Sequence, residues 1–273
     1  MTEQFVFHIR NAPPGDLAAT LQTLDNHPEL STIPEVVEQA ESTGYVIQDH
    51  RRLEALVTAR DLGLVHQNRN ALTEQGEVIA QLELHKPDLF VDIVHGLLYD
   101  LWDTRQKGEK CFSWSYRALC RILWEGGDQR LATRRELASQ IEAQARSAFS
   151  RPDVVFSPKS IGGALLWLCE LNPTVLSEDE ARFSRRDFCP PELFIMAIDF
   201  VYRDQDIEYG VNLLLSDRNL TAICQYCLLD TERFERVLEY AVAQFDYLHK
   251  GVGGGWGQYL VLDRASELES FAR

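Results

Sequence analysis

The sequence predicts a mainly α-helical protein, and three observations support this fold class. Apolar residues recur every three or four positions over long segments, as in residues 86–104, where Phe90, Ile93, Val94 and Leu97 share one helix face. Glycine, proline and hydroxyl residues stand at the ends of such segments, where they cap or stop helices. Patterns typical of strands are short, and they are confined to residues 5–9, 64–67 and 258–262.

Two helices are expected near the N-terminus. The first begins after Gly15 and runs to about Leu24. The second is capped by Ser31 or Thr32, has Pro34 in its first turn and ends at Gly44. Both signals mark helix ends, so the two helices are expected to be short.

A third helix is expected at about 49–62, with Gly63 as its stop signal. A short strand follows at 64–67, Arg69 and Asn70 form a turn, and Thr73 caps a further helix that includes Val78 and Ile79. This order, with "DLGLV" before the turn and "LTEQGEVI" after it, resembles winged-helix modules of the large bacterial regulator type. The resemblance covers residues 16–84. It implies a winged-helix domain at 1–84, with one helix placed for a DNA major groove and a wing near the backbone.

The middle of the chain, residues 85–205, predicts a bundle of helices. After the helix at 86–104, helices are expected at 113–124, 132–149, 160–171 and 191–202. Gly126 and Gly127 end the first of these four, and a polar loop at 177–186 precedes the last.

Residues 206–273 have an organisation of their own. A short helix is expected at 219–229, and Asp230 or Thr231 caps a longer helix whose apolar face extends to Leu248. The glycine run at 251–257 then breaks the helix before a strand at 258–262. Helix, helix, glycine turn and strand make a second winged-helix-like unit the hypothesis for this region.

The formal charge of −15 excludes a general binder of polyanions, because phosphate contacts require local positive charge. Residues 1–104 hold 6 Lys and Arg against 17 Asp and Glu, and residues 160–273 hold 10 against 19. Residues 105–159 reverse the balance, with 11 against 6. Two interpretations of this basic segment stay open: solvated helix faces, or a docking surface for nucleic acid or an acidic partner.

The candidate nucleic-acid-binding residues fall into two groups. The expected recognition helix and wing of the first domain carry Arg51, Arg52, Arg60 and Arg69. The basic segment, in which Trp114 and Tyr116 are interleaved, carries Arg105, Lys107, Lys110, Arg117, Arg121, Arg130, Arg134 and Arg135. The acidic residues beside the first group, Asp49, Glu54 and Asp61, favour the alternative of a winged helix that contacts protein.

The chain shows no strong catalytic or metal motif. Cys224 and Cys227 form a CxxC pair without a second pair nearby, and they are expected to pack in the core. The run GVGGGWG lacks the Lys-Ser/Thr ending of a phosphate loop, so it predicts a hairpin turn. Asp199 and Asp204 are the remaining metal candidates, for a divalent-metal nuclease. We expect no cofactor and no bound metal.

The whole chain also resembles winged-helix accessory proteins of bacterial defence islands, notably those that accompany DNA-modification-linked restriction. This resemblance lies in the order of "LT…G", the apolar helix with Trp102, then Trp124 and the segment "FSPKSIGGALLW". It implies a non-enzymatic subunit that docks protein partners, with DNA as a candidate second partner. The alternatives are a dimeric winged-helix transcription regulator and the nuclease. With no secretory signal and no apolar run of membrane-spanning length, we expect a cytoplasmic protein without membrane contact.

Overall fold

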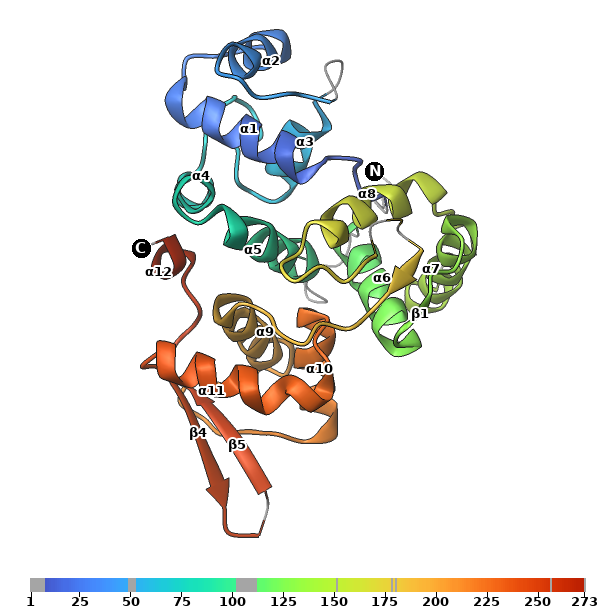
Figure 1. Cartoon of the computed structure of the whole chain (residues 1–273), viewed down its shortest axis with the longest axis vertical. Helices are drawn as coiled ribbons and strands as arrows, with labels where there is room; N and C mark the ends of the chain where they lie inside the picture. The colour runs from blue at the N-terminus through green and yellow to red at the C-terminus, as the bar shows by residue number, and fades with distance from the viewer. Residues whose placement is uncertain are drawn as a thin grey trace. The chain divides into compact units, whose positions relative to one another are not determined.

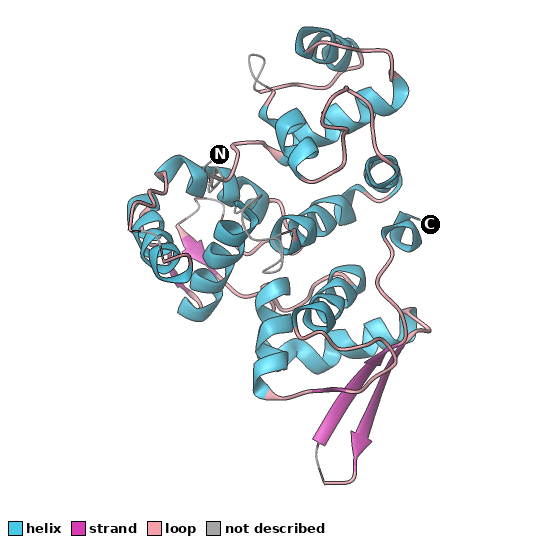
Figure 2. Ribbon diagram, turned by 180° about the vertical axis from the view of Figure 1, so that it is seen from behind, coloured by secondary structure: helices cyan, strands magenta, loops and turns pink. Residues whose placement is uncertain are grey.

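The structure is a computed structural model, and it describes residues 8–48, 53–101, 112–150, 152–177, 179, 181–255 and 257–272. Twelve α-helices dominate these residues, and the strands are few and short (Figures 1 and 2). The predicted mainly α fold class is therefore confirmed. None of the described helices is long and apolar enough to cross a membrane. The expected strand at 5–9 lies largely outside the described residues.

The chain divides into two compact units. The first comprises Met1–Leu119, Ala132–Leu171 and Leu268–Arg273, and the second comprises Cys120–Leu131 and Asn172–Glu267. Residues of the central domain expected at 85–205 occur in both units. The expected domain boundaries at 84 and 205 stay predictions, because compactness alone does not show which segment folds independently.

The first unit is built from helices that pack in two groups. Helix α1 contacts α2, α3 and α4, while α7 packs on α8, and α5 contacts both α4 and α8. Helix α6 begins in this unit and ends in the second. The helices are α1 (Pro14–Asn26), α2 (Ile33–Ser42), α3 (Glu54–Asp61), α4 (Glu74–His85), α5 (Pro87–Asp100), α6 (Phe112–Gly126), α7 (Arg134–Ala148), α8 (Pro158–Cys169) and α12 (Leu268–Ala272).

We call α1–α4 and the turns between them the N-terminal module. Thr32 caps α2 in a reciprocal capping box with Glu35, and Thr73 caps α4 by accepting a hydrogen bond from the Gly76 N–H. Between α3 and α4 the chain turns back through a single β-bridge that joins Val65 to Leu72. The helix caps and the turn expected in this region are thus confirmed, but the strand expected at 64–67 is reduced to this single bridge.

Close backbone packing explains the glycines of the "LGLV…LT..G" pattern. Gly63 adopts φ +76°, a conformation that favours glycine, and so α3 ends there. At Gly76 a Cβ atom would overlap the carbonyl oxygen of Leu64, so only glycine lets α4 start against the hairpin. The Thr73 hydroxyl completes this junction by donating to the Gly63 carbonyl at 2.6 Å.

Helix α3 is shorter than the helix expected at 49–62. It begins at Glu54, because Leu53 adopts a left-handed backbone conformation with φ 43°, which does not continue an α-helix. Its C-terminal end matches the expectation. Residues 49–52 lie outside the described residues.

The second unit combines three helices with a small antiparallel sheet. Its elements, after the end of α6, are β1 (Gln129–Arg130), β2 (Arg182–Phe183), α9 (Pro191–Asp204), β3 (Leu213–Leu214), α10 (Asp217–Cys227), the 3-10 turn η1 (Thr231–Arg233), α11 (Phe234–Gln244), β4 (Leu248–Gly253) and β5 (Gly257–Leu262). Strand β1 pairs with β2, and the other sheet has the order β3-β5-β4. Helix α9 packs against both α10 and α11.

We call α9 through β5 the C-terminal module. Helix α9 is buried on all sides from Leu193 to Tyr202. Its Phe194 packs against Phe234 and its Phe200 against Tyr226, at ring separations of 5.3 and 5.5 Å. The buried Tyr202 ties α9 to the sheet: its hydroxyl donates to the Val211 carbonyl at 2.7 Å and accepts from the Leu262 N–H at 3.0 Å. The β4–β5 hairpin projects beyond these helices (Figure 1).

The strand predicted at 258–262 is confirmed as β5, but two neighbouring features differ from the expectation. The helix expected to extend to Leu248 ends at Gln244, because Phe245 already has an extended backbone, and Leu248 begins β4. Strand β3 was not predicted. It consists of two residues that pair with β5, Leu213 with Leu260 and Leu214 with Tyr259.

Candidate interaction surfaces

Arg60 and Arg69, the described candidate cations of the N-terminal module, have different environments. Nη2 of Arg60 donates to Oδ1 of Asn70 at 2.6 Å, so this side chain holds the hairpin turn. Nη2 of Arg69 lies 2.9 Å from Nε2 of His66 on the exposed side. Arg60 is therefore a structural residue, and Arg69 stays available at the surface. Arg51 and Arg52 lie outside the described residues.

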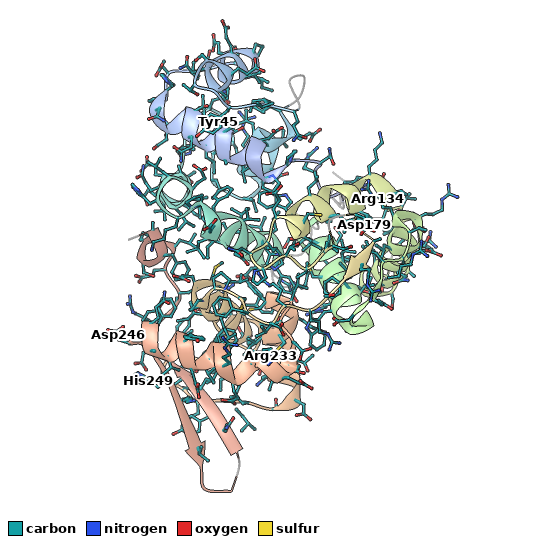
Figure 3. The ribbon with its side chains drawn as sticks, viewed as in Figure 1. Tyr45, Arg134, Asp179, Arg233, Asp246 and His249 are labelled. Carbon is teal, nitrogen blue, oxygen red and sulfur yellow. The ribbon has the colours of Figure 1, made fainter. Side chains whose placement is uncertain are left out.

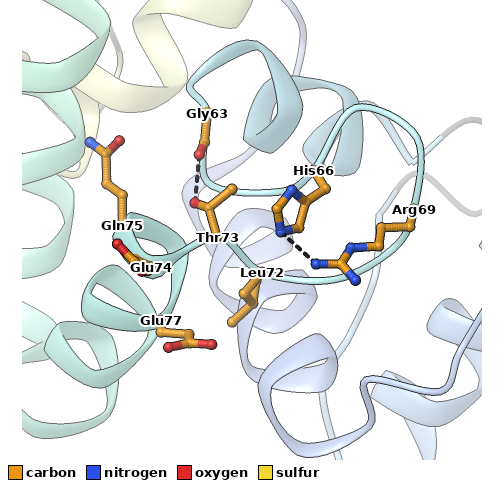
Figure 4. Close-up of a pocket in the computed structure, with 8 residues that line it drawn as sticks. All are labelled: Gly63, His66, Arg69, Leu72, Thr73, Glu74, Gln75 and Glu77. Carbon is orange, nitrogen blue, oxygen red and sulfur yellow. Dashed lines mark hydrogen bonds between the residues drawn. The ribbon is translucent and has the colours of Figure 1, made fainter.

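A pocket of ≈ 590 Å³ opens between this hairpin and the start of α4 (Figure 4). Arg69 and His66 line one side of it, and the carboxylates of Glu74 and Glu77 line another. Carboxylates in the first turn of a helix are favourable for the helix but repel a phosphate there. The pocket therefore does not present the positive surface that duplex DNA requires.

Arg117 from the basic segment is a core residue and not a surface cation. Only 5% of it is exposed, its Nε donates to the Tyr99 carbonyl at 3.0 Å, and its guanidinium lies 5.2 Å from the Tyr99 ring centre. Tyr116 is buried as well, with its hydroxyl 2.8 Å from Nδ1 of His95. The expected alternation of aromatic and basic residues therefore partly serves packing of α5 against α6.

The remaining described cations of the basic segment belong to two different units. Arg134 and Arg135 are exposed at the start of α7 in the first unit, and Figure 3 labels the first of them. Arg121 and Arg130 are exposed in the second unit. Arg105, Lys107 and Lys110 lie outside the described residues. The basic segment is therefore continuous in the sequence, but its described cations are divided between the two units.

The cysteine pair of α10 packs in the core of the C-terminal module. Cys224 and Cys227 are fully buried together with Cys189, and burial raises the pKa of both α10 thiols. Thiols are the unreactive form, so this environment disfavours metal binding and redox chemistry. Among the described residues, no group of three or more His, Cys, Asp or Glu side chains is arranged to hold a metal ion.

Asp199, one of the two acidic metal candidates, accepts hydrogen bonds from protein donors. Its carboxylate, 4% exposed, accepts from the Tyr209 hydroxyl at 2.7 Å, from Nε of Arg203 at 3.1 Å and from the Ser266 hydroxyl at 3.2 Å. Asp204 is exposed at the end of α9 and makes no such cluster with it. Asp199 therefore links α9 to the segment that follows β5.

The glycine run forms the tip of the β4–β5 hairpin, as the sequence predicts. Val252 pairs with Gln258 and Gly253 with Gly257, and the turn lies between them. Val252 is 77% exposed at this tip. A hairpin tip followed by a strand has no helix N-terminus to receive a phosphate, so no phosphate loop is formed here.

The exposed side of α11 was not predicted from the sequence. Tyr240 is 50% exposed on this helix, and its ring meets the edge of Phe188 with the ring centres 6.0 Å apart. Tyr240 stands outside the apolar stripe of Val237, Leu238 and Ala241, which faces the core. The sequence signal for this exposed side was therefore Tyr240, an aromatic residue outside the apolar stripe of the helix.

Charged and polar pairs lie on the same segments as these two rings or next to them. We call Phe188, Tyr240 and these pairs the α11 surface. Arg233 contacts Asp187 at 3.0 Å, and Lys250 of β4 approaches Glu239 at 3.7 Å. Gln244 also donates to Glu192 at 2.7 Å. Figure 3 labels Arg233, which precedes α11, and His249 at the base of the hairpin. An aromatic centre with a polar rim is the composition typical of protein-binding sites.

No protein-family model, curated protein or solved structure matches the chain. The function is therefore argued from the order of the elements and from the chemistry of the α11 surface.

Proposed function

We propose that this chain is a non-enzymatic subunit of a prokaryotic nucleic-acid-processing or antiviral defence complex. It docks a protein partner through the α11 surface, with DNA as a candidate second partner. The observation that carries the proposal is the half-exposed aromatic pair Phe188 and Tyr240 inside a rim of paired charges. Aromatic anchors surrounded by a polar rim contribute most of the binding energy in many protein interfaces.

The topology of the C-terminal module supports the winged-helix part of the proposal. Helix, strand, helix, helix and hairpin follow one another, and the first strand pairs with the last in the order β3-β5-β4. In a winged helix, the helix before the hairpin is the recognition helix and the hairpin is the wing. Helix α11 and the β4–β5 hairpin would take these roles.

A dimeric transcription regulator is the second candidate, because the same helix and wing would read a DNA groove. The charge of the second unit disfavours it. Its two segments hold 11 Lys and Arg against 19 Asp and Glu, and Lys250 on the wing is already beside Glu239. A phosphate would compete with these carboxylates for each cation. A protein partner of mixed charge meets no such penalty.

The test compares Tyr240→Ala with Tyr240→Phe in a pull-down against the products of neighbouring genes. We expect the alanine variant to lose binding by about 30-fold, the loss of a typical aromatic hot spot of about 2 kcal/mol, and the phenylalanine variant to keep it. A mobility-shift assay on duplex DNA at 50 and 200 mM salt accompanies it. A free dimer that shifts one specific duplex, with a strong salt dependence, would overturn the subunit proposal in favour of the regulator.

A further inference from the structure

A second pocket, of ≈ 530 Å³, lies in the N-terminal module, away from the hairpin and its arginines. Its lining comes from the ends of three helices and the segment after α2: Gln22, Thr23, Asn26, His27, Thr43, Tyr45 and Leu84. The volume falls within the range of about 300–1,000 Å³ that is typical of small-molecule sites. Figure 3 labels Tyr45 between α1 and α2.

Three helices end at this pocket, and their C-termini contribute a negative electrostatic potential to it. Most of the lining residues lie in the last turn or at the C-terminal cap of α1, α2 or α4. A helix C-terminus carries a partial negative charge, which cations in the last turn usually offset. Neither α1 nor α2 has a basic residue in its last turn.

Glu83, next to the lining Leu84, makes the same region more negative. Gln22 donates a hydrogen bond to its side chain, and burial raises the pKa of the carboxyl group. Among the described residues no Lys or Arg forms an ion pair with Glu83, and the nearby Lys86 donates to the Phe271 carbonyl at 2.8 Å instead. A carboxylate in the last turn of a helix destabilises that helix, and the basic residue in the last turn of α4 is His85.

One buried polar group that lines the pocket also lacks a hydrogen bond within the described part of the chain. Thr23 is 4% exposed, and its hydroxyl has no hydrogen-bond partner among the described residues. Burial and the Glu83 charge raise the pKa of Tyr45, so its phenol stays protonated. Its half-buried ring offers a π face, which attracts cations, beside the exposed apolar side chain of Leu84.

We propose that this pocket binds a small organic cation, namely a primary alkylammonium ion of the size of a diamine. The ammonium group would be neutralised by the Glu83 carboxylate and by the three helix C-termini, and the methylene chain would lie along Tyr45 and Leu84. This site is in the first unit, so it is independent of the α11 surface in the second.

The test measures putrescine binding to the full chain by calorimetry at pH 8. 1,4-Butanediol, which has the same length without charge, is the ligand control. Glu83→Gln keeps the shape and a hydrogen bond to Gln22 but removes the charge. Glu77→Gln changes the net charge equally at the other end of α4 and is the variant control.

We expect putrescine to bind the unaltered chain and the Glu77→Gln variant alike, with at least a tenfold loss in Glu83→Gln and no binding of butanediol. Tyr45→Ala is the second variant, with a loss of similar direction. Equal binding by Glu83→Gln, equal binding of butanediol, or no binding of putrescine at millimolar concentration would each overturn the proposal. Because none of these variants touches α11, failure here leaves the pull-down result unchanged.

Discussion

The N-terminal and C-terminal modules use the same succession of helices and a hairpin but stabilise the hairpin differently. In the N-terminal module the hairpin is one bridge between Val65 and Leu72, held by Arg60 and by the close approach of Gly76 to Leu64. In the C-terminal module the hairpin is a ladder of six residue pairs, with β3 as a third strand. The first hairpin depends on a few side chains and one glycine, whereas the second depends on backbone pairing.

This difference also separates the two candidate roles. The cation that would have faced DNA in the first module, Arg60, is used to hold the turn. The wing cation of the second module, Lys250, lies beside Glu239. In each module a candidate cation is thus held by a partner within the protein, whereas the proposed ligand pocket lies in the first module and the exposed aromatic pair in the second.

The largest effect is expected from Gly76→Ala, which tests whether the first hairpin depends on a single close approach. The new Cβ would overlap the Leu64 carbonyl oxygen, a backbone atom that cannot rotate away. We expect the free energy of unfolding to fall by about 3 kcal/mol or more, measured by urea unfolding with circular dichroism.

The matched control is Gly15→Ala at the exposed start of α1, where a Cβ meets nothing within 4 Å. It should be neutral or stabilising by up to about 1 kcal/mol. If both substitutions had the same small effect, the close approach at Gly76 would not determine the stability of the N-terminal module.

A smaller effect is expected from Tyr202→Phe, which tests the C-terminal module. Loss of the hydroxyl leaves the Leu262 N–H and the Val211 carbonyl without this partner inside the module. The unfolding free energy should fall by about 1–3 kcal/mol, since buried groups lose their hydrogen bond. Tyr240→Phe removes a hydroxyl from the exposed α11 surface, and it should change the unfolding free energy by less than about 0.5 kcal/mol. Equal losses for the two variants would contradict the role given to Tyr202.

The two modules also show which parts of the fold could be predicted. Signals that act within a few residues were reliable: Thr32 and Thr73 as caps, Gly63 as a stop, and the glycine run as a turn. Pairing between distant residues was not visible, because the two-residue strand β3 has no pattern of its own and is defined only by β5, more than forty residues later. Leu248 was placed on a helix because a three-residue spacing from Phe245 fits a helix as well as it fits this bend.

The same limit applies to the candidate sites. Residue type identified Arg60, Arg117 and Asp199, but burial and specific partners determined that all three are structural. The pair of Tyr240 with Phe188 and the pocket beside Glu83 arise from segments far apart in the chain. Such sites depend on tertiary packing, which local sequence patterns do not encode.

The smallest effect, and one of opposite sign, is expected from Glu83→Gln. The pKa of Glu83 is raised in the folded protein, so between its unfolded and folded values the folded chain binds more protons. Stability is therefore lost as the pH rises through this window, and the charged carboxylate is a cost at pH 7. Glu83→Gln should stabilise the protein by about 0.3–1 kcal/mol at pH 7, because it also removes a negative charge from a helix C-terminus.

The pH dependence and a second glutamate on the same helix make this prediction specific. At pH 3, where the Glu83 carboxyl is protonated in both states, the substitution should have no effect on the unfolding free energy. Glu77→Gln, in the first turn of α4, should destabilise the protein at pH 7, because there the negative charge is favourable. If Glu83→Gln were destabilising at pH 7, the charge would have a structural partner. A stabilising effect instead means that the N-terminal module keeps this carboxylate at a cost in stability, which is the behaviour expected of a binding residue.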